Sequence, residues 1–304
     1  MLKLDENKIR KGKPVGLPYV GSKKKLSKKI AQIIAQNFGT DKPVYDLFGG
    51  GGAITAELMI NDMDVVYNDL DKTITDMFNR VLHQDREWIK TLIVSRDEFF
   101  IIKDKDNRTV DDELKLLINS FGNNCNNYLY SEKTSDIKYN LAVEILNKED
   151  TFSGYKKTKT YLKAVNLYGE ELGFLDKEEK SRILQQFSRL QQLERLQKLG
   201  VLLKSSNKDY HFFSNVKNSI LYLDPPYENA PNTYKTGSFD SEEFYDWAYK
   251  MSKCNTVIIS SYEVNDERFE PVFEFKTARS TLNPKGYGNR TEKLFMVKEG
   301  IFNG

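Results

Sequence analysis

Two short segments of this chain carry side chains whose types and spacing suit chemistry. The more specific one is Asp224-Pro225-Pro226-Tyr227, directly after the apolar run 220–223. Two consecutive prolines end a strand and fix the backbone that follows, so carbonyl oxygens there are not used in the sheet ladder. A carboxylate and a carbonyl held side by side can accept both N–H bonds of an exocyclic amine and direct its lone pair at an electrophile.

Adenine N6 is an amine that needs this help, because its lone pair is delocalised into the ring. Orientation by Asp224 and the Pro225 carbonyl would replace a strong base, since the amine becomes acidic as it is methylated and then loses a proton to Asp224 or water. A base inside a duplex cannot reach a methyl donor, so we expect Tyr227 to stack on a base flipped out of the helix. A sulfonium methyl is the electrophile that this arrangement predicts.

The second segment is a glycine-rich loop, residues 46–52, between a predicted strand at 43–48 and a predicted helix at 53–60. Glycines let the backbone approach a ligand closely, and a helix N-terminus presents unpaired N–H groups. The loop lacks the spacing of a phosphate-binding loop, which favours a ligand with adenosine but no phosphate, such as S-adenosylmethionine. The loop residues expected at the ligand are Asp46, Phe48, Gly50 and Gly52.

Asp69 follows a second apolar run at 65–67, about 20 residues beyond the glycine loop. An acidic side chain in this position can accept hydrogen bonds from both ribose hydroxyls. The alternative is a helix cap, but Asp71 is available to cap the helix that follows. We therefore expect Asp69 to bind the ribose.

The surrounding pattern predicts an α/β fold. Strands at 43–48 and 65–67 alternate with helices at 53–60 and 74–82, which is typical of a parallel sheet that binds its ligand at the carboxyl ends of its strands. Strand signals resume at 201–204, 219–223 and 256–260, with a helix at 241–253 and closing strands at 269–275 and 293–297. We expect a Rossmann-like S-adenosylmethionine-dependent methyltransferase sheet with an inserted, mainly helical domain.

The inserted domain is placed at 86–199, and the catalytic domain at 1–85 and 200–304. The stretch 91–117 is helical and charged, and 120–168 is polar. A long amphipathic helix is predicted at 176–199, with Asp176 as its N-cap, Gly200 after its end and its arginines on the solvated surface.

In this order the motifs resemble those of the Dam-type (D12 class, alpha group) DNA adenine-N6 methyltransferases across essentially the whole chain. The glycine loop, Asn68-Asp69 and the segment 224–227 are similar to the family's glycine-rich, ribose and catalytic motifs, and 19–23 resembles its N-terminal aromatic-x-Gly-Gly-Lys motif. The resemblance implies that Tyr19 and Lys23 bind S-adenosylmethionine and that Asp209 contacts its adenine amine. Arg290 and Glu292 resemble a C-terminal hairpin segment near the target base. Ser22, Gly49 and Gly51 depart from the family pattern without removing a functional group.

The inserted domain would recognise the DNA target. Asparagine can pair bidentately with adenine edges, tyrosine can stack or wedge, and lysine can hold phosphates. The candidates for DNA contact are Asn123, Asn124, Asn127, Tyr128, Tyr130, Lys133, Lys156, Lys157 and, by resemblance, Arg290. Lysines also crowd residues 8–29, where they favour either a phosphate contact or a solvated face.

Composition narrows the other possibilities. Two cysteines and two histidines offer no disulfide framework and no metal site, and a net charge of +2 is too small to indicate nucleic-acid binding by itself. No stretch is apolar enough to cross a membrane. We expect a cytoplasmic enzyme, acting as a monomer on double-stranded DNA, alone or beside a cognate restriction endonuclease, with no metal and with S-adenosyl-L-methionine converted to S-adenosyl-L-homocysteine.

Three alternatives stay open. An N4-cytosine methyltransferase would use the same acceptor geometry, although Asp rather than Ser at position 224 favours adenine by resemblance. A protein or RNA amine methyltransferase fits the long Asn/Lys/Tyr-rich insert less well than a DNA methyltransferase does. A catalytically silent DNA-binding module would not need Asp69 and Asp224.

Overall fold

The computed structural model describes residues 1–19, 22–169, 184–200, 204–226, 239–275 and 291–298. The chain forms two compact units. The sheet unit comprises Met1–Pro14, Lys23–Thr75 and Leu202–Gly304, and the helical unit comprises Val15–Ser22 and Asp76–Val201. The helical unit thus includes 15–22 and 76–85, which the sequence assigned to the catalytic domain. That the two units divide catalysis and target recognition between them stays a prediction.

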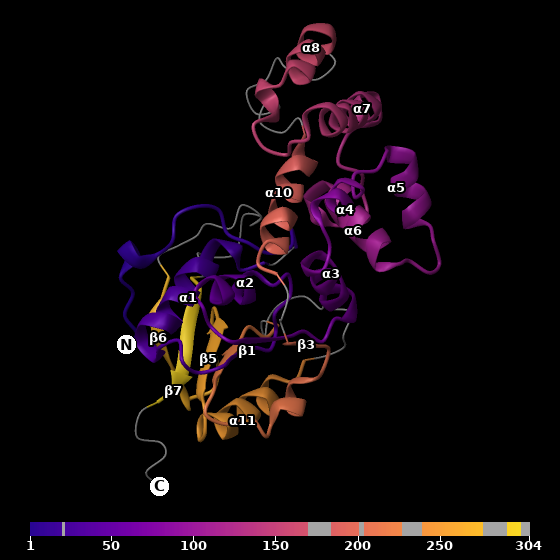
Figure 1. Ribbon diagram of the computed structural model, residues 1–304. Helices are drawn as coiled ribbons and strands as arrows, with labels where there is room; N and C mark the ends of the chain where they lie inside the picture. The colour runs from indigo at the N-terminus through magenta and orange to yellow at the C-terminus, as the bar shows by residue number, and fades with distance from the viewer. Residues whose placement is uncertain (20–21, 170–183, 201–203, 227–238, 276–290, 299–304) are drawn as a thin grey trace. The chain divides into compact units, whose positions relative to one another are not determined.

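The described part of the sheet unit contains one seven-stranded sheet in the order β3-β2-β1-β4-β5-β7-β6 (Figure 1). The strands are β1 (Val44–Asp46), β2 (Val65–Asn68), β3 (Lys204–Ser206), β4 (Ile220–Leu223), β5 (Thr256–Ser261), β6 (Phe269–Glu274) and β7 (Lys293–Val297). Strands β3, β2, β1, β4 and β5 pair in parallel, and β7 pairs antiparallel with both β5 and β6. The predicted Rossmann-like α/β fold is confirmed. The predicted strand at 201–204 reaches β3 only at Lys204, because 201–203 lie outside the described residues.

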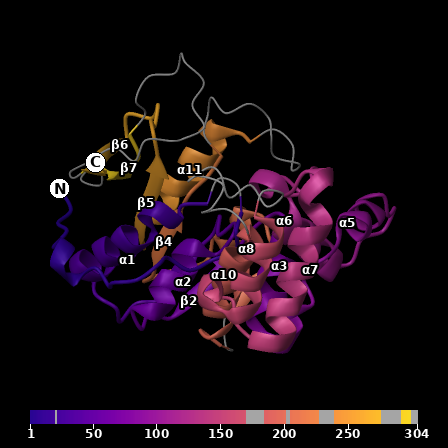
Figure 2. The same ribbon diagram turned by 90° about the horizontal axis from the view of Figure 1, so that it is seen from above.

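Helices cover both faces of the sheet. In this unit they are η1 (Glu6–Lys8), α1 (Lys24–Phe38), α2 (Ala53–Ile60), the start of α3 (Lys72–Leu82), η4 (Tyr210–Phe213) and α11 (Ser241–Ser252). Helices α1 and α2 lie on one side of the sheet and α11 on the other (Figures 1 and 2). Successive residues of a strand point to opposite faces, so Tyr222 packs with the α1 side while Leu221 and Leu223 pack with α11.

Helix α1 is an element that the sequence reasoning missed. Its lysines drew attention to charge, but Leu26, Ile30, Ile33 and Ile34 recur at helical spacing. The three isoleucines are fully buried in the core beneath α1 and α2. The apolar spacing therefore carried the structural signal, and the lysines occupy the rest of the helix surface.

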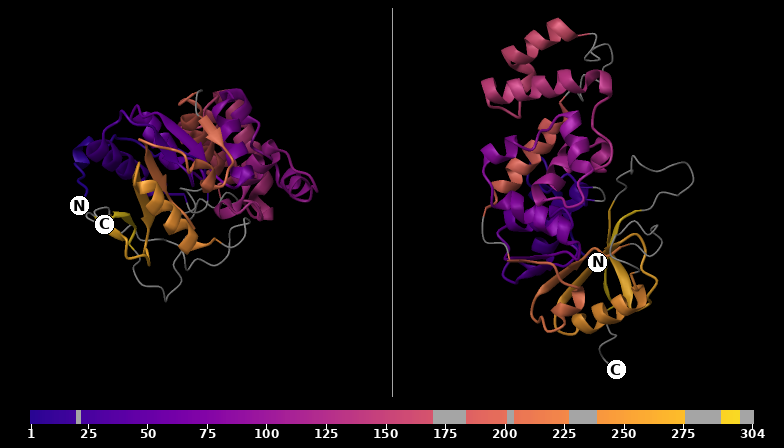
Figure 3. Two further views of the ribbon diagram at one scale, coloured as in Figure 1. Left: turned by 90° about the horizontal axis from the view of Figure 1, so that it is seen from below. Right: turned by 90° about the vertical axis from the view of Figure 1, so that its right-hand side faces the viewer.

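The described part of the helical unit holds, besides the rest of α3, the elements α4 (Arg86–Lys90), α5 (Arg96–Lys103), α6 (Val110–Asn119), η2 (Phe121–Asn123), α7 (Glu132–Glu149), η3 (Tyr155–Lys157), α8 (Lys159–Tyr168) and α10 (Gln185–Gln197). The right-hand view in Figure 3 shows the helices of this unit. The second half of the predicted helix at 176–199 is found as α10, whereas its predicted cap, Asp176, lies outside the described residues.

The prediction that the arginines of this helix are solvated is wrong for Arg189. Its side chain is buried, and its guanidinium donates to the carbonyls of Leu117 (3.2 Å), Ile118 (2.6 Å) and Ser120 (2.8 Å). These carbonyls belong to the end of α6, where backbone acceptors have no helical partner and where positive charge is favoured. Arg189 therefore fixes the point at which the polar loop 120–130 leaves α6.

None of the helices that the structure describes is long and apolar enough to cross a membrane.

Candidate active site

Three acidic residues stand at the carboxyl ends of neighbouring strands in the sheet unit. Asp46 is the last residue of β1, Asp69 follows the end of β2, and Asp224 follows the end of β4. The strands β2, β1 and β4 are adjacent and parallel, with Asp46 in register with Tyr67 on one side and Tyr222 on the other. Parallel strands end at a common edge, so the fold brings the three predicted carboxylates together.

The glycine loop after β1 is held tightly against the end of β2. The Gly49 N–H donates to the carbonyl of Asn68 (2.8 Å), and the Tyr67 hydroxyl donates to the carbonyl of Gly50 (2.7 Å). A Cβ atom at Gly49 would lie 2.3 Å from the Tyr67 ring, so only glycine fits there. Gly52 caps α2 with φ +68°, a conformation that favours glycine. Two of the loop's glycines are therefore required by packing and backbone shape.

Phe48, predicted at the cofactor, packs in an aromatic cluster on the α11 side. Its ring lies 6.1 Å from Tyr210, 6.3 Å from Phe239 and 5.7 Å from Phe244, measured between centroids. The side chain is half-buried, so this packing leaves part of it accessible. The cluster anchors the glycine loop to the layer of α11.

Asp46 is a buried carboxylate with only one of its oxygens satisfied. Oδ2 accepts the backbone N–H (3.1 Å) and the hydroxyl (2.6 Å) of Thr55, near the start of α2. Oδ1 is buried and has no hydrogen-bond partner among the residues that the structure describes. Burial raises the pKa of Asp46 to about 7, against the lowering effect of the Thr55 hydroxyl. An unpartnered buried acceptor at the edge of the sheet fits a ligand that brings its own donor.

Asp69 connects the glycine loop to the start of α3. Its Oδ2 accepts the Gly50 N–H (2.7 Å) and its Oδ1 accepts the Asp71 N–H (2.8 Å). Asp71 in turn accepts the N–H groups of Thr73 (2.8 Å) and Ile74 (3.4 Å), so it caps α3 as expected. Burial raises the pKa of Asp69. A carboxylate has about four acceptor positions, so two backbone donors leave capacity for ribose hydroxyls.

Asn68 is a positioning residue whose role the sequence did not reveal. Its fully buried amide donates to the carbonyls of Leu47 (3.0 Å) and Lys208 (2.9 Å), and its oxygen accepts the Ser206 hydroxyl (2.8 Å) and the Lys208 N–H (2.9 Å). These four bonds join the loops that follow β1 and β3 to the end of β2. A polar residue at the end of an apolar run was the only available signal.

Asp224 forms a buried ion cluster with Lys23 and Glu292. Lys23 Nζ lies 2.6 Å from Asp224 Oδ1 and 3.0 Å from Glu292 Oε1, and the Ser260 hydroxyl donates to Glu292 Oε1 (2.8 Å). Burial raises the pKa of Asp224 to about 6, although Lys23 opposes the shift. Burial alone would lower the pKa of Lys23, but Asp224 and Glu292 outweigh it and raise that pKa above its usual range. Lys23 is therefore a permanent cation beside the predicted catalytic carboxylate.

Two members of this cluster, Ser260 and Glu292, had no role derived from residue types alone. Ser260 lies near the carboxyl end of β5, and Glu292 directly precedes β7. Because β5 and β7 are antiparallel, the end of one meets the start of the other, with Ser260 opposite Leu294. Polar residues at the two ends of these apolar strands were the signal that could have paired them.

Two of the cofactor residues implied by resemblance have local structural contacts. Asp209 caps η4 and its Oδ1 accepts the N–H of His211 (2.9 Å) and lies 2.6 Å from His211 Nδ1. Its side chain is about half exposed and so is accessible to a ligand. Tyr19 belongs to the helical unit, where its N–H donates to the Leu17 carbonyl (2.8 Å). The cofactor contacts of both residues stay predictions.

The structure corrects the assignment of Tyr128 and Tyr130 as DNA-binding residues. Both are buried in the core of the helical unit, with exposed fractions of 5% and 6%. The Tyr128 hydroxyl donates to the Val94 carbonyl (2.9 Å), and the Tyr130 hydroxyl bonds to Gln186. Their rings pack edge to face. They cannot stack on a base without unfolding this core, so they support the loop before them.

The loop before Tyr128 presents its polar side chains to solvent. Asn124 and Asn127 are exposed, Asn123 is half-buried, and Phe121 is 61% exposed. Asn124 Oδ1 accepts the backbone N–H groups of Asn126 (2.9 Å) and Asn127 (3.1 Å), so this side chain shapes the loop. Among the predicted asparagines, Asn127 is therefore the better placed to read a base.

The predicted phosphate-binding lysines lie on the surface of the helical unit. Lys133 is exposed near the start of α7, and Lys156 and Lys157 are exposed on η3. Tyr155 anchors η3, because its ring lies 5.4 Å from that of Tyr161 and 5.0 Å from that of Phe187.

The N-terminal lysines do not form a single surface. Lys23 is buried in the ion cluster, Lys28 donates to the carbonyls of Arg10 (3.2 Å) and Gly12 (2.7 Å), and Lys29 pairs with Glu6 (2.6 Å). These three lysines therefore have local structural partners, which weighs against a shared phosphate-binding surface at residues 8–29.

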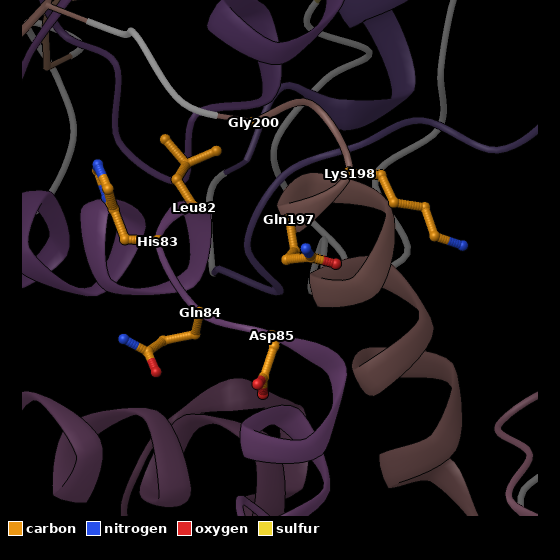
Figure 4. A pocket seen from close by; sticks show the side chains of 7 residues that line it. All are labelled: Leu82, His83, Gln84, Asp85, Gln197, Lys198 and Gly200. Carbon is orange, nitrogen blue, oxygen red and sulfur yellow. The ribbon is translucent and has the colours of Figure 1, made fainter.

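The helical unit also contains an open cavity of about 580 Å³ between the ends of α3 and α10 (Figure 4). It is lined by Leu82, His83, Gln84, Asp85, Gln197, Lys198 and Gly200. Asp85 caps α4 through the Trp88 N–H (2.8 Å), and His83 Nδ1 lies 2.8 Å from the Asn79 carbonyl. The cavity contains none of the predicted site residues. Nowhere in the described ranges do three or more His, Cys, Asp or Glu side chains gather as they would to bind a metal.

Two predicted residues, Tyr227 and Arg290, lie outside the described residues, as do Val20 and Gly21 of the N-terminal motif. Asp224, Pro225 and Pro226 are described, and Pro225 is buried.

Comparison with known proteins agrees with the geometry of the strand ends. No curated protein matches the chain. The sequence model of the D12 class N6 adenine-specific DNA methyltransferases matches residues 19–274, a span that includes β1 to β6, the glycine loop, Asp69 and Asp224. This is well over half of the chain, and it covers both structural units. The chain therefore belongs to the D12 class N6 adenine-specific DNA methyltransferase family and is an adenine-specific DNA methyltransferase.

Proposed function

We propose that this enzyme transfers a methyl group from S-adenosylmethionine to N6 of an adenine flipped out of double-stranded DNA, at a specific sequence. The observation that carries the proposal is the meeting of Asp46, Asp69 and Asp224 at the ends of three adjacent parallel strands. One edge of the sheet then holds both the acceptors for a nucleoside ligand and the acceptor for an amine. A cytoplasmic location, where DNA is accessible, follows from this proposal.

The residues at this edge fit S-adenosylmethionine. Asp46 Oδ1, buried and without a partner among the described residues, suits the ammonium of the amino-acid portion. Gly49 packs too closely against Tyr67 to carry a side chain, so this part of the loop presents only backbone, and Asp69, which accepts the Gly50 N–H, has acceptor positions left for the ribose. When bound, S-adenosylmethionine supplies a methyl group on a positively charged sulfur. The three carboxylates also favour a cation, because Asp69 and Asp224 each raise the pKa of Asp46, after burial itself.

Asp224 orients the target amine. Its carboxylate accepts one N–H of adenine N6 and the Pro225 carbonyl accepts the other, which leaves the lone pair free for attack. Asp224 must be ionised to do this, and Lys23, 2.6 Å from its Oδ1, keeps it so despite its burial. After transfer Asp224 or water takes the released proton. Tyr227, three residues after Asp224, is assigned to stacking on the flipped base.

The helical unit is proposed to bind DNA through the loop 121–127 and the lysines beyond it. Phe121 offers an exposed aromatic face that takes the stacking role first assigned to Tyr128 and Tyr130, and Asn127 offers an amide for a base edge. Lys133, Lys156 and Lys157 supply charge for phosphates. Whether a restriction endonuclease accompanies this enzyme, and whether it acts as a monomer, stay predictions.

The test compares Asp224→Asn with wild-type enzyme in single-turnover methylation of DNA with labelled S-adenosylmethionine. The variant keeps the shape of the side chain but loses the charge that accepts the amine. We expect the rate to fall about 100-fold or more, with DNA affinity nearly unchanged, because phosphate contacts supply most of the binding energy. Glu270→Gln, on the exposed face of β6, is the matched control and should behave as wild type. A variant at position 224 with near-normal rates would remove Asp224 from the mechanism.

A further inference from the structure

A lysine shared between a buried and a largely buried carboxylate is the least expected feature of the sheet unit. Lys23, from the start of α1, contacts Asp224 at 2.6 Å and Glu292 at 3.0 Å. The exposed fractions of the three side chains are 9%, 19% and 7% in the order Lys23, Asp224 and Glu292. Ser260 donates to the same Glu292 oxygen that contacts Lys23, at 2.8 Å, and so holds it in place.

Stability does not explain the second carboxylate. One carboxylate is enough to neutralise a buried ammonium, and each further buried charge carries a desolvation cost. Glu292 also repels Asp224. Burial is the main cause that raises the pKa of Asp224, and the negative charge of Glu292 raises it further. The presence of Glu292, which lowers stability and opposes the ionisation of the catalytic carboxylate, needs another explanation.

The proposed chemistry supplies one, because Lys23 competes with the substrate. An ammonium carries three N–H donors, and Lys23 already directs one of them at Asp224 Oδ1. The target amine requires an oxygen of the same carboxylate. If Asp224 were the only buried partner of Lys23, the ion pair would resist entry of the amine, since breaking it would leave a buried charge unpaired.

We propose that Glu292 is a positioning residue that acts through Lys23: it retains the lysine ammonium while the target amine binds to Asp224. Between turnovers Lys23 stands in for the amine on the Asp224 carboxylate. When adenine enters, Lys23 keeps its contact with Glu292 and gives up its hydrogen bond to Asp224 Oδ1, while its charge stays close enough to keep Asp224 ionised. This inference rests on the proposed function, and it assigns to Glu292 a role in admitting the base.

The other groups around Asp224 do not provide Lys23 with a second acidic partner. Those that face it or influence its ionisation from neighbouring elements are Tyr222 on β4, Asp46 at the end of β1 and Asp69 after β2. Burial raises the pKa of Tyr222 well above its usual range, so it stays neutral. Asp46 and Asp69 are acids, so neither supplies a cation that could compete with the target amine. Among these described groups, Glu292 is the acid that contacts Lys23 together with Asp224.

The test uses Glu292→Gln, which keeps the shape of the side chain and an acceptor for Ser260 but removes the charge. Lys23 should then lose the charged partner that retains it while the amine binds to Asp224. We expect kcat to fall about tenfold, with the affinity for S-adenosylmethionine unchanged. The acid limb of the pH profile of kcat should also move to lower pH. Asp224 loses a repelling charge and Lys23 pairs with it more closely, and both changes lower the pKa of Asp224. Glu292→Asp keeps the charge and should restore part of the rate.

A double-mutant cycle separates this role from a merely structural one. In a Lys23→Met background, Glu292→Gln should have no further effect on capture of a fluorescent adenine analogue at the target position, because there is no lysine to hold. Ser260→Ala, which removes a contact to Glu292 without changing any charge, should give a smaller loss of kcat, about threefold. The Ser260→Ala variant keeps the inference testable if the variant at position 292 does not fold.

The outcomes are distinct. An unshifted acid limb, or an equal loss of base capture from Glu292→Gln with and without Lys23, would overturn the positioning role while wild-type methylation continued. Wild-type enzyme that transfers no methyl group to DNA would overturn the proposed function, and this inference with it.

Discussion

Replacing Asp46 by Asn should change stability in a way that depends on pH. The pKa of Asp46 is raised from 3.8 to about 7 because the carboxylate is buried. The native state therefore takes up a proton near pH 7, whereas the unfolded chain does so near the ordinary carboxyl pKa of 3.8. Wild-type protein gains stability as the pH falls through 7 and loses it as the pH rises, by about 1.4 kcal/mol per pH unit between these two pKa values.

Asp46→Asn removes this dependence, because the amide does not titrate. The free energy of unfolding of the variant minus that of wild type should thus be about 2–3 kcal/mol higher at pH 8 than at pH 5. Relative to wild type, the variant is therefore more stable at pH 8 than at pH 5. The amide NH₂ that replaces the buried Oδ1 brings an unsatisfied donor, which costs about 1–3 kcal/mol at both pH values. The pH difference is therefore more informative than either value alone.

Urea unfolding at pH 8 and pH 5 measures both values. Asp64→Asn is the control, because the Asp64 side chain is 63% exposed and its ion pair with Lys204 spans 3.7 Å at the surface. Its effect should be small at both pH values. An Asp46→Asn effect of equal size at pH 8 and pH 5 would refute the argument from burial. Weaker binding of S-adenosylmethionine by this variant, measured by calorimetry, would show that the site trades stability for ligand binding.

Asp69→Ala should raise the dissociation constant for S-adenosylmethionine at least about tenfold, since each hydrogen bond to a charged group contributes about 1.5–3 kcal/mol; equal calorimetric binding would leave Asp69 a loop-positioning residue. Changing Lys156 and Lys157 to Gln should weaken binding to cognate and scrambled duplexes alike and flatten the salt dependence by up to about one counterion per lysine; an unchanged slope would place the phosphates elsewhere. Asn127→Ala should cost about 1–3 kcal/mol against the cognate duplex alone. Equal losses on both duplexes would make the loop a backbone clamp.

The sheet was predictable because its strands carry the signal locally. Apolar runs that end in polar residues predicted β1, β2, β4 and β5 and placed Asp69 and Asp224 at the same edge. The helix at 53–60 matches the prediction, since glycines precede it and its composition is apolar throughout. These elements were predictable because residues close together in the sequence determine them.

Contacts between distant segments were not predictable. Lys23 and Glu292 are separated by 269 positions, and they meet only because α1 packs on the sheet and β7 pairs with β5. Tyr128 and Tyr130 were misjudged for a related reason, because the surrounding asparagines suggested an exposed segment. The loop instead turns at 122–125, with positive φ at Gly122, Asn123 and Cys125, and returns the tyrosines to the core.

The central claim is that this enzyme methylates adenine N6 in DNA from S-adenosylmethionine. The most direct measurement is mass spectrometry of nucleosides from double-stranded DNA incubated with the enzyme and S-adenosylmethionine carrying an isotopically labelled methyl group. The account predicts that the label appears in N6-methyldeoxyadenosine, and that it appears far more slowly with Asp224→Asn. Label in N4-methyldeoxycytidine, or in no nucleoside at all, would contradict it.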